Sequence, residues 1–218
     1  MSFFEFLQVY QSKIWLEFVQ HLRIITISIP MAILISAPLG FFISSRPKLA
    51  KIVLNIASIL MTIPSLALFG IMVVVLAPFK LGLGMTPAVV AISVYSILPI
   101  TRNIYTALNQ VSSSIVEAAV GLGMSRGQIL SQIKIPLSVP VIMAGVRNAV
   151  VLGVSVATFA SLVGAGGLGS LIFSGISRTN LKMVVVGALL VSFLGIVVNY
   201  LFLILEDALT PAGLKTKN

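Results

Sequence analysis

The side chains in this sequence that could do chemistry are few and lie far apart. The 218 residues include one histidine, His21, and no cysteine, so thiolate metal sites and cysteine nucleophiles are excluded. The long uncharged runs hold no pair of carboxylates for acid–base work, and no His-x-x-x-His spacing occurs. The sequence also lacks the Gly-Lys-Ser/Thr ending of a phosphate-binding loop. We therefore expect no catalytic residue, no metal ligand and no bound cofactor, and we expect His21 to lie at a membrane edge.

One polar stretch, from Glu117 to Pro136, stands out because it interrupts a long apolar sequence. Two capping-box spacings, Ser114 to Glu117 and Ser125 to Gln128, predict two helix starts. Glycines between them are expected to end the first helix, and Pro136 is expected to limit the second. Two short helices with a glycine elbow form either an amphipathic connection resting on lipid headgroups or a docking surface for another protein.

The composition indicates the elements that must position this stretch. The chain is 58% hydrophobic and 9% charged, whereas soluble domains are about 25% charged. Five runs without any charge each exceed the roughly 20 residues that cross a bilayer as a helix. Helices are favoured because backbone groups in hydrocarbon must bond internally. We predict an all-α fold, a polytopic membrane helix bundle, with five spans at about 22–45, 52–77, 85–104, 148–167 and 183–205.

The distribution of charge predicts the orientation. In a soluble protein the net charge of +9 would suggest nucleic acid, but here the cations flank the spans, as the positive-inside rule describes. Nine basic residues fall on one side of the predicted membrane and five on the other. We therefore expect the N-terminus outside, the C-terminus in the cytoplasm and no nucleic-acid partner. The loop at 112–136, between the third and fourth spans, would then be cytoplasmic.

One membrane domain is expected at residues 18–200, with an extracytoplasmic lead-in at 1–17 and a short cytoplasmic tail at 207–218. The start of the fourth span is the uncertain boundary, because an earlier start would bury the charge of Arg147 inside the bilayer. We therefore expect residues 136–147 to run along the membrane interface.

The spans themselves offer no source of energy. Ion-coupled transporters usually carry an ionisable group within the bilayer, and the five uncharged runs contain none. Any transport through this bundle would either be driven by another protein or be passive.

The polar stretch also carries a recognisable spacing. It resembles the EAA loop of membrane permease subunits in ATP-binding-cassette (ABC) importers, whose pattern is Glu-Ala-Ala-x3-Gly-x9-Ile-x-Leu-Pro. Ile135 stands where that family usually has leucine. The matching positions are Glu117, Ala118, Ala119, Gly123, Ile133 and Pro136. Further stretches resemble the osmoprotectant branch of these permeases: 63–70, 86–91 with Tyr95, 140–145 and 163–169.

The resemblance implies a compact permease of the methionine-importer type, with the EAA loop coupling it to an ABC ATPase subunit that binds ATP and Mg²⁺. It further implies an extracytoplasmic substrate-binding protein or lipoprotein, and a second permease subunit, either a similar partner or an identical copy. The implied solute is glycine betaine, carnitine or choline. The alternatives are another small solute, such as an amino acid or a bile-type compound, and a passive channel.

No motif marks the translocation path. Four polar or amphipathic residues within the spans could line it: Thr62, Ser65, Tyr95 and Asn148. The same residues could instead form hydrogen bonds between helices.

Overall fold

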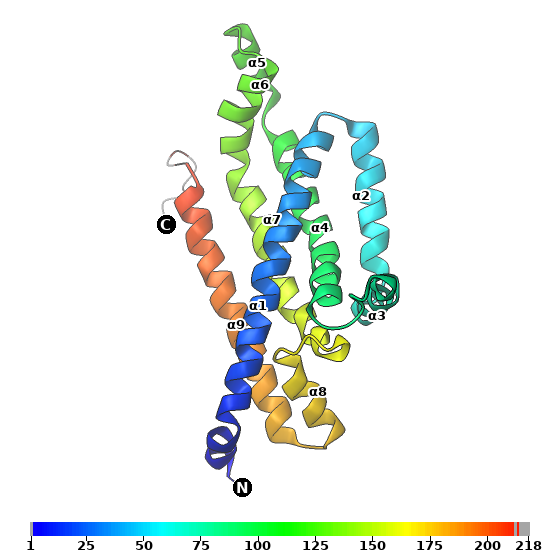
Figure 1. Cartoon of the computed structure of the whole chain (residues 1–218). Helices are drawn as coiled ribbons and strands as arrows, with labels where there is room; N and C mark the ends of the chain where they lie inside the picture. Colours follow the sequence, from blue (N-terminus) through cyan, green and yellow to red (C-terminus); the bar gives the residue numbers. More distant parts are fainter. Residues whose placement is uncertain (1, 212, 214–218) are drawn as a thin grey trace.

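The computed structural model describes residues 2–211 and 213, and all the regular structure in that part of the chain is helical (Figure 1). The long helices are α1 (Phe3–Ser44), α4 (Met85–Gln110), α7 (Ile135–Val156) and α9 (Leu181–Leu209). The shorter α-helices are α2 (Pro47–Thr62), α3 (Ser65–Leu76), α5 (Ser113–Gly121), α6 (Arg126–Gln128) and α8 (Gly169–Ser177). Two 3-10 segments and one π-helix complete the set: η1 (Ala77–Phe79), η3 (Ala157–Val163) and the π-helix η2 (Ile129–Lys134).

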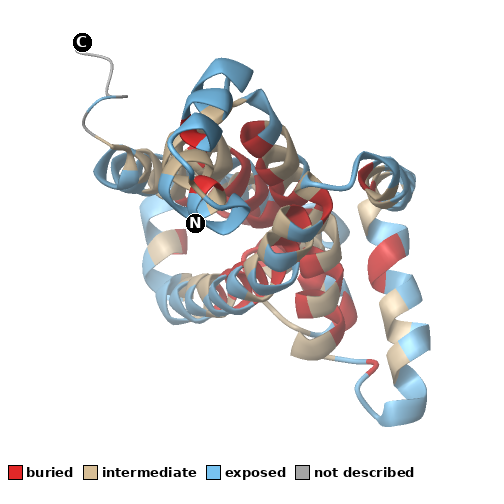
Figure 2. Ribbon diagram, turned by 90° about the horizontal axis from the view of Figure 1, so that it is seen from above, coloured by how far each residue is buried: buried red, intermediate tan, exposed pale blue. Residues whose placement is uncertain are grey.

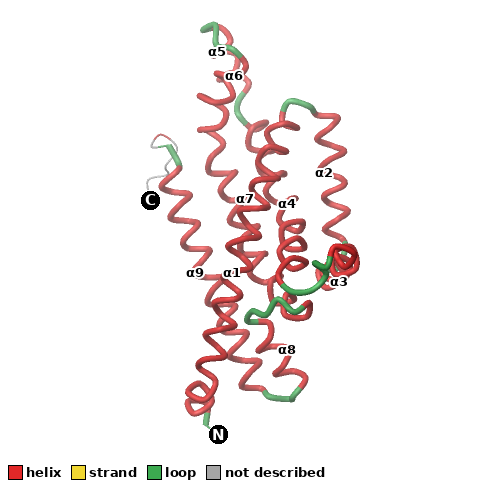
Figure 3. The backbone as a smooth tube through the Cα atoms, in the orientation of Figure 1, coloured by secondary structure: helices red, strands yellow, loops and turns green. Residues whose placement is uncertain are grey.

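The helices run side by side along one long axis (Figures 1 and 3). Helices α1, α4 and α9 run one way, α2 and α7 run the other way, and α3 lies across them. Helices α5 and α6 project at one end, which we call the α5 end. Helix α8 and the N-terminus lie at the opposite, α8 end. The all-α membrane bundle is therefore confirmed, with α5 and α6 between the third and fourth passages.

The core forms where α1 and α4 pack closely. Small residues on the face of α1 allow that approach, as in other membrane helix pairs. A Cβ on Gly40 would lie 2.8 Å from the side chain of Ile104, and the hydroxyl of Ser93 donates to the carbonyl of Ser28 at 3.0 Å. Figure 2 shows the buried residues gathered where the long helices meet. The small positions recur at every fourth residue: Ser28, Ala32, Ser36 and Gly40.

The first span is longer than predicted. The expected lead-in at 1–17 and span at 22–45 form one helix of 42 residues, which begins with a capping box between Ser2 and Glu5. At 1.5 Å per residue this helix is about 63 Å long, roughly twice the hydrocarbon thickness of a bilayer. The lead-in is not separate because Phe6 is fully buried against Leu168, Leu171 and other residues of the α8 end.

The predicted span at 52–77 is broken. Helices α2 and α3 meet at an angle of 100° around Ile63 and Pro64, where one span was predicted. Proline has no N–H and disfavours helical geometry at the residue before it, and Ile63 has an extended ψ of 124°. Four helices in the described residues are long and apolar enough to cross a membrane, or five if α2 and α3 count as one bent span.

The helix that contains the fourth predicted span begins much earlier than residue 148. A single helical stretch runs from Arg126 to Val163, so Pro136 does not limit it and residues 136–147 belong to the same helix. Arg147 is accommodated because its Nε lies 3.8 Å from a carboxylate oxygen of Glu206 on α9. The fifth helix extends beyond the predicted 183–205, so that the predicted tail starts inside α9.

Candidate functional site

The EAA-like stretch forms two helical segments around a sharp turn at the α5 end. Helix α5 ends at Gly121, and Gly123 has a φ of +79°, which glycine adopts without strain. The N–H of Gly123 donates to the carbonyl of Val120 at 2.9 Å, and that of Met124 donates to Ala119 at 3.1 Å. These bonds satisfy carbonyls at the helix end and set the direction in which the chain leaves. The predicted glycine elbow is therefore present.

One predicted capping box forms and the other does not. Ser125 and Gln128 exchange both bonds, at 3.3 and 2.8 Å. Helix α5, however, begins at Ser113, so Ser114 already lies inside the helix and its hydroxyl contacts that of Ser112 at 2.7 Å. Glu117 is consequently exposed, and it has no hydrogen-bond or ion-pair partner among the described residues.

The exposed part of α5 is apolar around this carboxylate. Ile115 is 42% exposed, Val120 58% and Leu122 83%. Burying such side chains against a partner is favourable. We call this the tip surface: Ile115, Glu117, Ala118, Val120 and Leu122. Three of its members are not among the residues that the EAA spacing singles out, although apolar residues inside a polar loop are a signal that the sequence does carry.

The other motif residues support the tip rather than forming it. Ala119 is buried, and Ile133 and Pro136 are half-buried on the helix that follows. That helix starts with a π segment, in which the N–H of Ile135 bonds to Leu130 five residues back. Since Pro136 has no N–H, the altered bonding lets the helix pass this residue without breaking. The elbow at residues 122–125 is thus joined to α7 by continuous helix from Arg126.

The residues predicted to line a path have different surroundings. The hydroxyl of Tyr95 donates to the carbonyl of Ile63, beside Thr62 and Ser65 at the break between α2 and α3. The Thr62 hydroxyl donates to Ile59 within its own helix at 2.7 Å. Asn148 is exposed on α7, and no hydrogen bond joins it to the other three. Tyr95 therefore stabilises the break by satisfying a carbonyl that the helix leaves free.

His21 is fully buried inside the bundle, near the α8 end. Its Nε2 donates to the carbonyl of Val154 at 3.1 Å, and its Nδ1 accepts from the N–H of Leu168 at 3.3 Å. Gln20 accepts from the N–H of Gly167 at 3.2 Å. These bonds require a neutral imidazole and tie α1 to the glycine-rich turn before α8. The role of His21 in this structure is therefore packing and hydrogen bonding.

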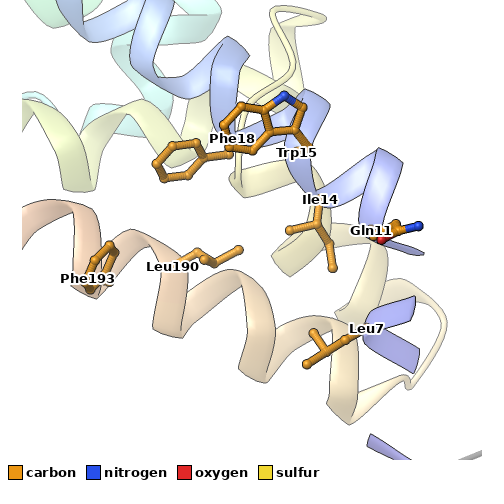
Figure 4. A pocket seen from close by; sticks show the side chains of 7 residues that line it. All are labelled: Leu7, Gln11, Ile14, Trp15, Phe18, Leu190 and Phe193. Atoms are coloured by element: carbon orange, nitrogen blue, oxygen red, sulfur yellow. The ribbon is translucent and has the colours of Figure 1, made fainter. Parts of the chain in front are cut away.

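An apolar groove of about 320 Å³ lies between the N-terminal halves of α1 and α9 (Figure 4). Trp15 and Phe18 stack there with ring centroids 5.9 Å apart, opposite Leu190 and Phe193. Gln11 is its polar lining residue. Without a charged side chain, this groove has no group for chemistry. In the part of the chain that the structure describes, no group of three or more His, Cys, Asp or Glu residues could hold a metal ion.

Comparison with known proteins identifies the family. Residues 24–212 match the binding-protein-dependent transport system inner membrane component. The osmoprotectant import permease protein OsmW of Salmonella typhimurium is 42% identical over 90% of this chain and 91% of its own length. The choline transport system permease protein OpuBB of Bacillus subtilis is 35% identical over 97% and 95%.

The fold has a solved counterpart. A chain of the MetNI methionine ABC transporter, in an inward-facing conformation, superposes with a TM-score of 0.82 over 97% of this chain and 100% of its own length, at 22% identity. At this level of identity the likeness concerns the fold alone. The predicted resemblance to ABC permeases is confirmed, and the chain belongs to the family of binding-protein-dependent transport system inner membrane components.

Proposed function

We propose that this chain is the permease subunit of an ATP-driven importer for a compatible solute such as glycine betaine, carnitine or choline. The observation that carries the proposal is the identity of 35–42% to permeases named for osmoprotectant and choline transport, over at least 90% of this chain. The MetNI fold gives the same architecture. The subunit holds no ATPase site of its own in this proposal, and a partner ATPase hydrolyses ATP.

The tip surface is the proposed contact with that ATPase. Exposed apolar side chains beside an unpaired carboxylate, Glu117, suit a groove that is apolar within and basic at its rim. The continuous helix from Arg126 onward supports this role, because a displacement of the tip that passes the elbow at Gly123 is carried along this helix into α7. In this arrangement the α5 end is cytoplasmic.

The remaining partners follow from the same architecture. An extracytoplasmic binding protein or lipoprotein delivers the solute at the α8 end. A second permease subunit, either similar or identical, completes the path, since one bundle whose core is filled by packed side chains encloses no channel of its own.

Reconstitution tests the proposal. The permease, its second subunit, the ATPase and the binding protein are placed in vesicles, and uptake of labelled glycine betaine, carnitine and choline is measured with and without ATP. ATP-dependent uptake of one of these solutes is expected. Uptake that does not depend on ATP would indicate a passive channel. ATP-dependent uptake of an amino acid or bile-type compound alone would indicate a different transported solute.

A further inference from the structure

A second groove lies beneath the tip surface, between the end of α1 and the start of the helix that leads into α7. It encloses about 480 Å³. Its walls are apolar and come from Phe41 on α1, Val116 and Val120 on α5, and Ile129 and Leu130 on the π segment. It also contains two cations, Arg126 and Lys134. We call it the basic groove.

The two cations have no acidic partner. Neither Arg126 nor Lys134 makes an ion pair with a described residue, and the residues that line the groove include no carboxylate. Glu117 belongs to the same helix as Val116 and Val120 but does not line the groove. Arg126 is exposed and Lys134 is half-buried, so both cations can be reached by an anion, and an anion close to both would be attracted to them. The groove is therefore electrostatically matched to a negatively charged group.

The depth of the groove identifies the kind of anion. Its α1 wall ends at Ser44 and Ser45, where the uncharged run 24–45 gives way to Arg46, Lys48 and Lys51. Cations that flank a membrane span lie at the level of the lipid headgroups. A lipid at this depth has its charged headgroup at the membrane surface and its acyl chains in the hydrocarbon. The groove likewise has cations beside apolar walls.

We propose that the basic groove binds one anionic phospholipid, with its phosphate between Arg126 and Lys134 and its glycerol and upper acyl chain against Phe41 and Leu130. The bound lipid bridges α1 to the segment that carries the tip surface. The site belongs to the permease alone and does not depend on which solute is transported.

A single fluorescent reporter can test the site. The only tryptophan, Trp15, is replaced by phenylalanine, and Phe41→Trp places a new reporter in the groove wall. The full chain is reconstituted in phosphatidylcholine vesicles with increasing fractions of brominated phosphatidylglycerol. We expect quenching to saturate at a low fraction of this anionic lipid, and brominated phosphatidylcholine to quench only in proportion to its abundance. Equal quenching by the two lipids would overturn the proposal.

Matched variants locate the charge. Each cation near a membrane surface contributes about fivefold to the attraction of an anionic lipid, so Arg126→Gln with Lys134→Gln should weaken the preference roughly 30-fold. Lys48→Gln with Lys51→Gln removes the same charge at the same end of the bundle but outside the groove lining, and it should change the preference little. An equal loss in both pairs would mean diffuse attraction rather than a site. The charge-keeping pair Arg126→Lys with Lys134→Arg should retain binding.

Further controls test whether another molecule occupies the groove and whether the variants fold. Val120→Glu leaves both cations in place but adds a carboxylate to the groove wall, so it should also reduce the preference for the anionic lipid. Circular dichroism checks that all the variants remain helical. Excess inorganic phosphate should leave the quenching unchanged, because phosphate alone does not use the apolar walls. Displacement by free phosphate, or by the partner ATPase, would assign the groove to that occupant and refute the lipid site.

Discussion

At Gly123 the backbone has a left-handed conformation, and no other atom lies within 4 Å of where a Cβ would be. The EAA spacing singles out this residue. Within this chain a side chain would have space here, so the positive φ is the property that favours glycine. A substitution at this position is therefore limited by backbone conformation and not by space.

This distinction gives a prediction at Gly123. Gly123→Val should redirect the elbow, since a β-branched residue is a clear outlier at positive φ, and transport should fall at least about tenfold while the protein still reaches the membrane. Gly123→Asn should retain most transport, because asparagine adopts this conformation at modest cost. Transport rate per amount of membrane-inserted protein is the measurement. Normal transport by the valine variant would contradict the assigned role of the elbow.

Glu117 gives a second prediction, because it makes no capping bond in this structure. Glu117→Ala should leave the thermal stability of the permease within about 0.5 kcal/mol, as for surface substitutions generally. It should nevertheless weaken co-purification with the ATPase, whereas Ser114→Ala on the same helix should not. A drop in stability without any change in ATPase association would mean that the carboxylate acts within the permease.

Among the elements, the break between α2 and α3 departs most from what the sequence indicates. Pro30, Pro38 and Pro99 lie inside unbroken helices, yet Pro64 accompanies a bend of 100°. Local sequence cannot separate these cases, since each proline removes one N–H. At the break before Pro64, the carbonyl of Ile63 has no helix partner and accepts instead from the hydroxyl of Tyr95 on α4.

Tyr95→Phe should therefore destabilise the bundle. The Ile63 carbonyl loses its donor in a region where little water can replace it, which costs about 1 kcal/mol and lowers the melting temperature by a few degrees. Tyr200→Phe is the matched control, because Tyr200 is largely exposed on α9. Thermal unfolding in a mild detergent would compare the two, and equal melting temperatures would show that the hydroxyl does not stabilise the break.

Features that depend on local sequence were predicted, and features that depend on contacts between distant residues were not. Uncharged runs predicted the long apolar helices, because hydrocarbon demands apolar residues and internally bonded backbone, but not the break between α2 and α3. Arg147 could not be placed, because its nearest charge, Glu206, is remote in sequence. Likewise, the capping pair at Ser125 follows from local spacing alone, whereas the depth of His21 depends on the distant Val154 and Leu168.

For the whole molecule, the ends of the bundle can be assigned to the two sides of the membrane by labelling. The chain has no cysteine, so a single introduced cysteine reports without background. Lys80→Cys, in the turn before α4, should react with an impermeant thiol reagent in intact cells, and Ser125→Cys should react only after lysis. Both residues are exposed. Labelling of Ser125→Cys from outside would reverse the proposed orientation.

The unbroken helix from Arg126 to Val163 has a mechanical consequence. Its 38 residues, at about 1.5 Å each, measure about 57 Å along the helix, longer than the membrane is thick. If this helix moved as a rigid body about its middle, a tilt of about 10° would swing each end by about 5 Å, in opposite directions. One end carries the elbow, and the other leads into the turn held by His21. A push on one face of the membrane is thereby turned into an opposite swing on the other face, with no hinge needed between them.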